Sequence, residues 1–293
     1  MSIKILQGNC LETLSSLEEK SVNTCVTSPP YWGLRDYGTD EQLGLEETPE
    51  KFVENLVNVF REVRRVLRDD GTVWLNLGDS YCGTGHKGDH TDPKHKDGRN
   101  GQKVALNNKI QGFKPKDLIG IPWRVAFALQ ADGWYLRQDI IWHKPNPMPE
   151  PVKDRCTKSH EYIFLLSKSP KYYYDYEAIK TKASDAADYD TSNKRSVWSI
   201  PVASYSEAHF ATYPPELIKP CILAGCPEGG TVLDPFGGSG TTAQVSNNLN
   251  RNAILCELNP EYVEIAKGRL HESLGMFLDL TVEIPLTKEK PNG

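Results

Sequence analysis

Two periodicities of hydrophobic residues alternate along the chain and predict an α/β fold. Short apolar runs at 3–6, 22–26 and 72–77 are typical of buried strands. Apolar residues at helical spacing follow the first run, and a longer amphipathic helix is predicted from Thr48 to Leu67. Because strands and helices alternate in this way, we expect a doubly wound sheet with helices on both faces.

The C-terminal third carries the clearest pattern. It predicts a strand at 231–234, a glycine turn at 236–240, a helix at 241–249, a strand at 253–257 and a helix at 259–271. This βαβα order is the unit from which doubly wound nucleotide-binding folds are built.

The middle of the chain mixes regular elements with polar stretches. The expected elements are helices at 118–131 and 214–224, a strand at 134–143, and a pair of strands at 161–167 and 171–175. The stretches at 80–116 and 181–195 hold few apolar residues. Loops as long as the first are usually functional or disordered.

Composition excludes several classes of protein. The 293 residues include 38% hydrophobic and 25% charged residues, which is ordinary for a globular protein. No apolar run approaches the length of a membrane span, and the N-terminus has no signal-peptide layout, so we expect a cytoplasmic protein. The seven cysteines include no C-x-x-C pair, which argues against a disulfide framework and a structural zinc. His86, His90 and His95 share one loop, but their spacing fits no tetrahedral site, and no metal is predicted.

The charge is distributed unevenly. The formal net charge of the whole chain is -5, yet residues 80–172 hold sixteen Lys and Arg against nine Asp and Glu. A basic middle on an acidic body is the electrostatic pattern expected of a protein that binds a polyanion. A solvated loop would show the same excess, so charge alone leaves both interpretations open.

The glycine turn is the first candidate binding element. In VLDPFGGSGTTA, at 232–243, the pattern Gly238-x-Gly240-x-x-Ala follows a strand directly. Glycines let the backbone approach a ligand, and Glu257 at the end of the next strand suits a pair of ribose hydroxyls. Asp234 suits the cationic end of a ligand, such as a sulfonium, better than a pyrophosphate. Many nucleotide-binding proteins share this fingerprint, so an NAD-dependent oxidoreductase stays an alternative here.

The second candidate element is the turn TSPPYW at 27–32, which ends the strand at 22–26. Pro30 holds Pro29 in an extended geometry, and proline has no N–H. The carbonyls of Ser28 and Pro29 are therefore expected to accept hydrogen bonds from an amine. Tyr31 offers a flat face on which an extruded base can stack.

These two elements suit methyl transfer to the exocyclic amine of a base. Such an amine is a poor nucleophile because its lone pair is delocalised into the ring. Acceptors around the nitrogen hold its protons in a tetrahedral geometry and localise the lone pair. A sulfonium is already an activated methyl donor, so positioning and electrostatics suffice, without a metal or a covalent intermediate.

Together the two turns resemble those of the amino-directed DNA methyltransferases, which use S-adenosyl-L-methionine to methylate adenine N6 or cytosine N4. The SPPY turn early and the DPFGGSGTT turn late resemble the circularly permuted β class of that family, and the similarity spans residues 5–270. The resemblance implies an α/β, Rossmann-like, seven-stranded methyltransferase fold with inserted target-recognition loops. Serine at position 28 is typical of the cytosine-N4 enzymes, so cytosine N4 is the expected target and adenine N6 the alternative.

The resemblance also implies roles for individual residues. It assigns the base to Ser28, Pro29, Pro30 and Tyr31. It assigns the cofactor to Asn9, Cys10, His209, Asp234, Pro235, Phe236, Gly238, Ser239, Gly240, Thr241 and Glu257. It assigns DNA contacts to Trp32, Arg35, Lys87, Lys103 and Lys144. Asn9 stands where the family usually has Asp.

The same resemblance suggests a division of the chain. A catalytic half at 1–79 precedes a target-recognition region at 80–197, which is interleaved with catalytic-domain elements at 118–143. A cofactor-binding half at 198–275 and a tail at 276–293 follow. The expected partner is double-stranded DNA, with its target base flipped out. A homodimer and a cognate restriction endonuclease of a restriction–modification system are left open.

Two further alternatives were weighed. A carbon-5 cytosine methyltransferase needs a cysteine nucleophile, and Cys221 follows a proline; but Cys221 lies in an apolar helical stretch and is expected to belong to the core. A DNA-binding protein without activity is disfavoured because both motifs are intact.

Overall fold

The structure of the chain, a computed structural model, describes residues 1–34, 38–39, 41–83, 110–150, 152–183, 190–202, 213–275 and 278–285. Nine strands of this part form one sheet in the order β11-β1-β10-β9-β2-β3-β5-β4-β8. Their bounds are Ser2–Gln7 (β1), Val22–Thr27 (β2), Leu67–Leu77 (β3), Tyr135–His143 (β4), His160–Ser167 (β5), Val197–Ser199 (β8), Thr231–Asp234 (β9), Asn252–Glu257 (β10) and Asp279–Glu283 (β11). All pairs are parallel except those of β5, which runs antiparallel to β3 and β4.

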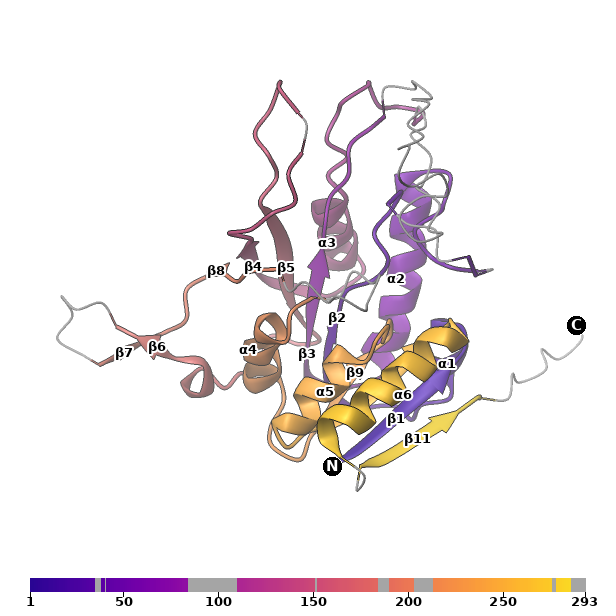
Figure 1. Cartoon of the computed structure of the whole chain (residues 1–293), viewed down its shortest axis with the longest axis vertical. Helices are drawn as coiled ribbons and strands as arrows, with labels where there is room; N and C mark the ends of the chain where they lie inside the picture. Colours follow the sequence, from indigo (N-terminus) through magenta and orange to yellow (C-terminus); the bar gives the residue numbers. More distant parts are fainter. Residues whose placement is uncertain are drawn as a thin grey trace, which may run out of the picture.

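Helices cover both faces of this sheet, as the alternating pattern predicts (Figure 1). One layer contains α1 (Cys10–Ser15), α2 (Pro49–Val66) and α3 (Ile121–Ala131). The other contains α4 (Pro215–Gly225), α5 (Thr241–Asn248) and α6 (Pro260–Leu274). A short helix, η2 (Glu177–Ile179), and a ladder of β6 (Thr181–Lys182) with β7 (Thr191–Ser192) complete the described elements. None of the described helices has both the length and the apolarity to cross a bilayer.

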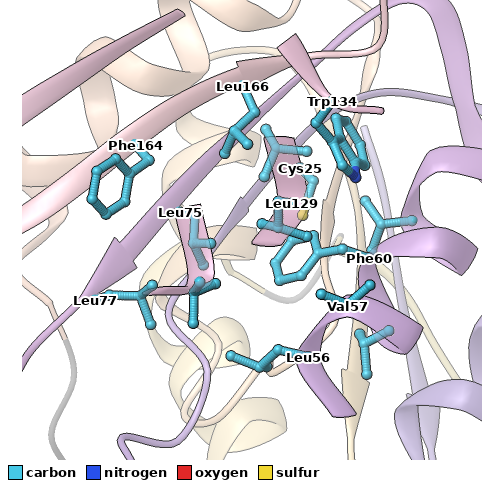
Figure 2. Close-up of a cluster of buried hydrophobic side chains, with 14 of the residues drawn as sticks. Cys25, Leu56, Val57, Phe60, Leu75, Leu77, Leu129, Trp134, Phe164 and Leu166 are labelled. Atoms are coloured by element: carbon cyan, nitrogen blue, oxygen red, sulfur yellow. The ribbon is translucent and has the colours of Figure 1, made fainter. Parts of the chain in front are cut away.

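Neighbouring residues of the central strands supply the two layers of the core. Leu75 of β3 packs under α2 and α3, whereas Trp74 faces α4. Cys25 and Val26 of β2 divide in the same way. Figure 2 shows the first of these layers, in which Cys25 and Leu75 meet Phe60 of α2. Because both faces are covered, the strands are apolar runs without alternation.

The predicted helix starts are confirmed for α2 and α6. Thr48 Oγ1 accepts a hydrogen bond from the backbone N–H of Lys51 at 3.2 Å, and Pro49 is the first helical residue. Asn259 Oδ1 accepts likewise from the backbone N–H of Glu261 at 2.8 Å. Local capping chemistry therefore fixes where these helices begin.

The direction of the chain connections reverses between β9 and β2. From β9 the chain continues to β10 on one side, and from β2 it continues to β3 on the other. The two strands are adjacent and parallel, with Cys25 beside Leu233. In open α/β sheets, ligands bind in the crevice at such a point, outside the carboxyl ends of the strands. The turns that follow β2 and β9 are consequently neighbours.

The prediction of a strand at 171–175 is wrong. The backbone N–H of Tyr173 donates to the carbonyl of Asp70 at 2.9 Å, outside any ladder, and the ring of Tyr174 stacks on Trp74 with centroids 6.1 Å apart. The run of tyrosines suggested a strand because aromatic residues favour sheets. In the structure these rings instead pack against neighbouring elements.

Two predicted boundaries are corrected. The stretch at 276–293 was expected to be a tail, but its residues 279–283 form β11, which pairs in parallel with β1. The helix predicted from Leu118 begins at Ile121, since Gly120 adopts a left-handed conformation (φ 77°) at the N-cap. Residues 118–120 serve as the connection from the preceding loop.

Candidate active site

One cavity of about 820 Å³ opens at the carboxyl edge of β2 and β9, and both turns line it. This volume lies within the range of small-molecule sites, about 300–1,000 Å³. The predicted site residues found in its lining are Asn9, Cys10, Ser28, Pro29, Pro30, Tyr31, Lys144, Pro235, Phe236, Gly238, Ser239 and Glu257. The tertiary structure therefore brings together two motifs that are about two hundred residues apart in the sequence.

Thr27 and Asp234, the last residues of β2 and β9, join the two turns. Thr27 Oγ1 donates to Asp234 Oδ1 at 2.6 Å. The carboxylate also accepts from the hydroxyls of Tyr213 and Thr242, at 3.0 and 2.5 Å, and from the N–H of Phe236 at 3.1 Å. Asp234 is 2% exposed and does not line the cavity. Its predicted contact with the cationic end of a ligand stays a prediction, and in the structure the carboxylate is occupied by four hydrogen-bond donors of the protein.

The glycine turn brings its backbone against the floor of the cavity. Gly238 and Gly240 have positive φ angles, 49° and 84°, which side chains rarely adopt. A Cβ on Gly240 would lie 3.2 Å from the Cβ of Ala266 in α6. Gly240 and Thr241 start α5 behind the turn and are not in the lining. They shape the turn, while Phe236, Gly238 and Ser239 face the ligand space.

Glu257 ends β10 beside the turn, as predicted. Its Oε2 accepts from the N–H of Gly238 at 2.7 Å, and its Oε1 accepts from the N–H of Asn259 at 2.8 Å. Burial raises the pKa of the Glu257 carboxyl, and the two backbone donors oppose this rise. Each oxygen of Glu257 thus accepts one backbone hydrogen bond and keeps a lone pair for a further donor.

Asn9 and Cys10 follow β1, the neighbour of β10 in the sheet, and also line the cavity. Asn9 Oδ1 caps α1 by accepting from the N–H of Leu11 at 2.9 Å, and its amide donates to Glu41 at 3.0 Å. Burial raises the pKa of the Cys10 thiol to about 12, so the thiol is protonated at neutral pH and is a weak nucleophile. Cys10 is thus suited to contact and not to covalent catalysis.

Tyr31 lies in the other half of the cavity, within a network of polar side chains. Its hydroxyl donates to Glu161 Oε2 at 2.7 Å and lies 3.1 Å from Asn76 Oδ1. Ser28 Oγ lies 3.4 Å from the same hydroxyl. A Cβ on Gly78 would come within 2.4 Å of the Tyr31 ring, so a glycine is required behind the ring. We call Ser28, Tyr31, Asn76, Glu161 and Lys144 the Tyr31 network.

Sequence reasoning missed two members of this network, Asn76 and Glu161. Both lie in predicted strands: Asn76 in the buried apolar run that became β3, and Glu161 at the start of the strand predicted at 161–167, which is β5. A polar residue within such a run was the available signal, because a buried polar group requires partners. Which partners it finds depends on the pairing of β3 with β5, which the sequence does not reveal.

Two residues that are predicted to contact DNA have partners within the protein. Trp32 is 7% exposed, packs in the core, and donates from its indole nitrogen to the carbonyl of Glu46 at 3.0 Å. Lys144 lines the cavity, pairs with Glu161, and lies over the Trp142 ring at 4.3 Å. Its ammonium therefore has a carboxylate partner within the cavity, and the contacts of Lys144 and Trp32 with DNA stay predictions.

Some predictions lie outside the described residues. These are Arg35, Lys87, Lys103, His209 and the three loop histidines His86, His90 and His95. Cys221 is described: it is buried in α4 and does not line the cavity, and burial raises the pKa of its thiol. These positions disfavour the cysteine nucleophile of a carbon-5 enzyme.

Comparison with known proteins decides the family. The model of the N6/N4 DNA methylase family matches residues 22–268, from β2 to the middle of α6. The chain belongs to this family. It is a DNA methyltransferase that uses S-adenosyl-L-methionine, and the alternatives of an oxidoreductase and a carbon-5 enzyme are set aside.

Relatives of this DNA methylase are similar to it in sequence over nearly its whole length. It is 52% identical to the type II methyltransferase M.SmaI of Serratia marcescens over 270 residues, which cover 92% of this chain and 91% of that protein. It is 53% identical to M.Cfr9I of Citrobacter freundii over 266 residues, covering 91% and 87% of the two proteins. These similarities confirm the resemblance that the two turns indicate.

Solved structures confirm the predicted methyltransferase fold. The cytosine-N4-specific PvuII DNA methyltransferase matches with a TM-score of 0.69 at 22% identity, covering 92% of this chain and 86% of that one. A putative DNA modification methylase from Thermus thermophilus, complexed with S-adenosyl-L-methionine, matches with a TM-score of 0.64 at 25% identity, covering 97% and 100% of the two chains.

The cavity of this DNA methylase fits its cofactor. The glycine turn leaves space that side chains would fill, and the Glu257 carboxylate next to it is the group expected for ribose hydroxyls. When bound, S-adenosyl-L-methionine supplies an activated methyl group. We propose Phe236, Gly238, Ser239 and Glu257 as its main contacts, together with Asn9 and Cys10.

Proposed function

We propose that this DNA methyltransferase modifies cytosine at N4 in double-stranded DNA, and that the target base turns out of the helix to enter the cavity. One observation carries the proposal: Ser28, Pro29 and Tyr31 line the same cavity as the glycine turn. A base held at the first motif is then adjacent to a methyl donor held at the second. Serine at position 28 and the cytosine-N4 specificity of the PvuII enzyme support cytosine over adenine.

In this reaction the protein would position the target base and supply hydrogen-bond acceptors to its amine. Hydrogen-bond acceptors at Ser28 and Pro29 would hold the protons of the amine and direct its lone pair away from the ring. The Tyr31 ring, supported from behind at Gly78, gives the base a flat surface. Trp142 and Phe236 add aromatic surface to the lining of the cavity.

The loop between β4 and β5 is the described segment best placed to contact the duplex. It projects beyond the sheet at the top of Figure 1. Asn146 pairs with both backbone groups of Val202, at 2.8 and 3.2 Å, and Arg155 pairs with Glu150 at 2.6 Å while lying over the Tyr81 ring. These contacts fix the loop at the rim of the cavity.

Met148 lies in this loop. Its side chain is 69% exposed and also lines the cavity mouth. Proteins that distort DNA often insert an apolar side chain such as methionine between base steps. We propose that Met148 occupies the space left by the extruded base, which offsets part of the cost of unstacking.

Mass spectrometry of nucleosides tests the proposed specificity. The protein is expressed in a host that lacks DNA methylation, and the DNA is digested to nucleosides. We expect N4-methylcytosine, and none with the Tyr31→Ala variant. N6-methyladenine would instead assign the chain to the adenine branch. Sequencing of the modified DNA would then define the recognition sequence.

The relatives carry the type II designation. This supports a place in a type II restriction–modification system, which we propose for this chain as well. Protection of its DNA from a restriction endonuclease that cuts the mapped sequence would test that role.

A further inference from the structure

The Tyr31 network links the base-binding turn to a carboxylate on another strand. Ser28 Oγ and the Tyr31 hydroxyl are 3.4 Å apart, and the Tyr31 hydroxyl is 2.7 Å from Glu161 Oε2. Glu161 is on β5, and its side chain is 14% exposed. The contacts therefore run along the wall of the cavity, from Ser28 through the Tyr31 hydroxyl to the Glu161 carboxylate.

The chemistry of these groups sets the direction of the hydrogen bonds. An ionised carboxylate can only accept, so the Tyr31 hydroxyl must give Glu161 its one proton. The Tyr31 oxygen then accepts a hydrogen bond from Ser28, and the single hydroxyl proton of Ser28 is used in this bond. As a result, Ser28 Oγ presents only lone pairs to the cavity.

The neighbours of Glu161 favour the same direction of hydrogen bonding, from Ser28 to Tyr31 to Glu161. Asn76 Nδ2 donates to the Tyr162 carbonyl at 3.1 Å and to Glu161 Oε2 at 3.2 Å, which turns Asn76 Oδ1 toward the Tyr31 hydroxyl as a second acceptor. Lys144, which can only donate, contacts the other oxygen of Glu161. The Tyr31 hydroxyl thus has two acceptors in the wall of the cavity, Glu161 and Asn76.

We propose that Glu161 is a positioning residue for the target base: acting through Tyr31, it fixes Ser28 as a hydrogen-bond acceptor. The inference rests on the proposed function, in which the amine of the base meets Ser28. An amine presents N–H donors to that position, whereas a carbonyl presents only lone pairs. The network therefore selects a base with an amine at this edge and rejects the same ring with a carbonyl.

Binding to modified duplexes tests the inference. Two duplexes carry cytosine or uracil at the mapped target position, each opposite an abasic site so that base pairing does not contribute. Their dissociation constants are measured in the presence of S-adenosyl-L-homocysteine. We expect the wild-type protein to prefer cytosine by about 10- to 100-fold, the effect of one unsatisfied buried polar group.

The Glu161→Gln and Tyr31→Phe variants should lose most of this preference. A glutamine can donate as well as accept, and phenylalanine removes the acceptor for Ser28, so Ser28 can then turn its proton toward uracil. We expect the preference to fall to about threefold or less, and kcat to fall at least tenfold, with KM for S-adenosyl-L-methionine within about twofold. The double variant should be no worse than Tyr31→Phe, because both changes break one network.

Glu62→Gln is the matched control, because Glu62 is a partly buried, ion-paired glutamate outside the cavity. It should behave as wild type. A Glu161→Gln variant that folds and keeps the full preference for cytosine would overturn the inference. If Glu161→Gln fails to fold, retention of the preference by Tyr31→Phe would overturn it instead. Should the enzyme methylate adenine, the proposed cytosine specificity fails, and the same comparison with adenine and hypoxanthine still decides the role of Glu161.

Discussion

Glu257 shows at the scale of one residue how burial and function interact. Its carboxylate must be ionised to accept hydrogen bonds from a ribose, but burial raises its pKa above the ordinary value of 4.5. As the pH falls toward this raised pKa, the carboxyl takes up a proton and loses acceptor capacity. The affinity for S-adenosyl-L-methionine should therefore weaken at a higher pH than an exposed glutamate would allow.

Calorimetry of cofactor binding between neutral and mildly acidic pH checks this prediction. Glu257→Gln should bind about 10- to 100-fold more weakly at neutral pH, because a charge-assisted hydrogen bond is lost, and should lose most of the pH dependence. Glu264→Gln, at an exposed ion pair on α6, is the control and should match wild type. An unchanged pH dependence in Glu257→Gln would assign the titration to another group.

At the scale of elements, the turn between β9 and α5 depends on the approach of α6. Gly240→Ala adds both a strained φ of 84° and a contact of 3.2 Å with Ala266, whereas Gly229→Ala adds a similar φ, 75°, with nothing within 4 Å. We expect urea unfolding to show a loss of about 1 kcal/mol for Gly229→Ala and about 2–3 kcal/mol for Gly240→Ala. Equal losses would mean that the backbone angle alone requires the glycine.

The loop between β4 and β5 carries a prediction at the same scale. Met148→Ala should lower the single-turnover rate on fully paired DNA by about tenfold or more, because extrusion of a paired base costs a few kcal/mol. On a duplex with the target base opposite an abasic site, the rate should be nearly unchanged. Ile284→Ala, at an equally exposed residue outside the cavity, serves as control. A loss on both duplexes would argue for a role other than base extrusion.

For the whole molecule, the uneven charge predicts how binding responds to salt. A duplex that contacts about six cationic side chains should bind about a thousandfold more weakly at 200 mM than at 50 mM salt, while cofactor affinity changes little. Lys153 is exposed in the β4–β5 loop, and Lys153→Gln should reduce the steepness of the plot of log affinity against log salt by about one. Lys4 pairs with Glu283 at the far edge of the sheet, and Lys4→Gln should leave this slope unchanged. Fluorescence anisotropy over a salt series measures both slopes, and equal slopes would place the DNA elsewhere.

The sequence by itself determined the layered α/β architecture, the starts of α2 and α6, and the two motifs that identify the family. These depend on local patterns: apolar runs, capping residues such as Thr48 and Asn259, and glycine or proline turns. Because the residue types of a motif are visible in the sequence itself, the chemistry of the motif can be predicted without a structure.

Only the tertiary structure decided which side chains meet. The bond from Thr27 to Asp234 and the bond from Tyr31 to Glu161 each join residues that are far apart in the sequence. The burial of Trp32 also depends on how the core packs. Likewise, β11 was hidden because its strand character comes from pairing with β1 and its residues are largely exposed. Such contacts follow from strand order and register, which are set by packing of the whole sheet and leave no local trace.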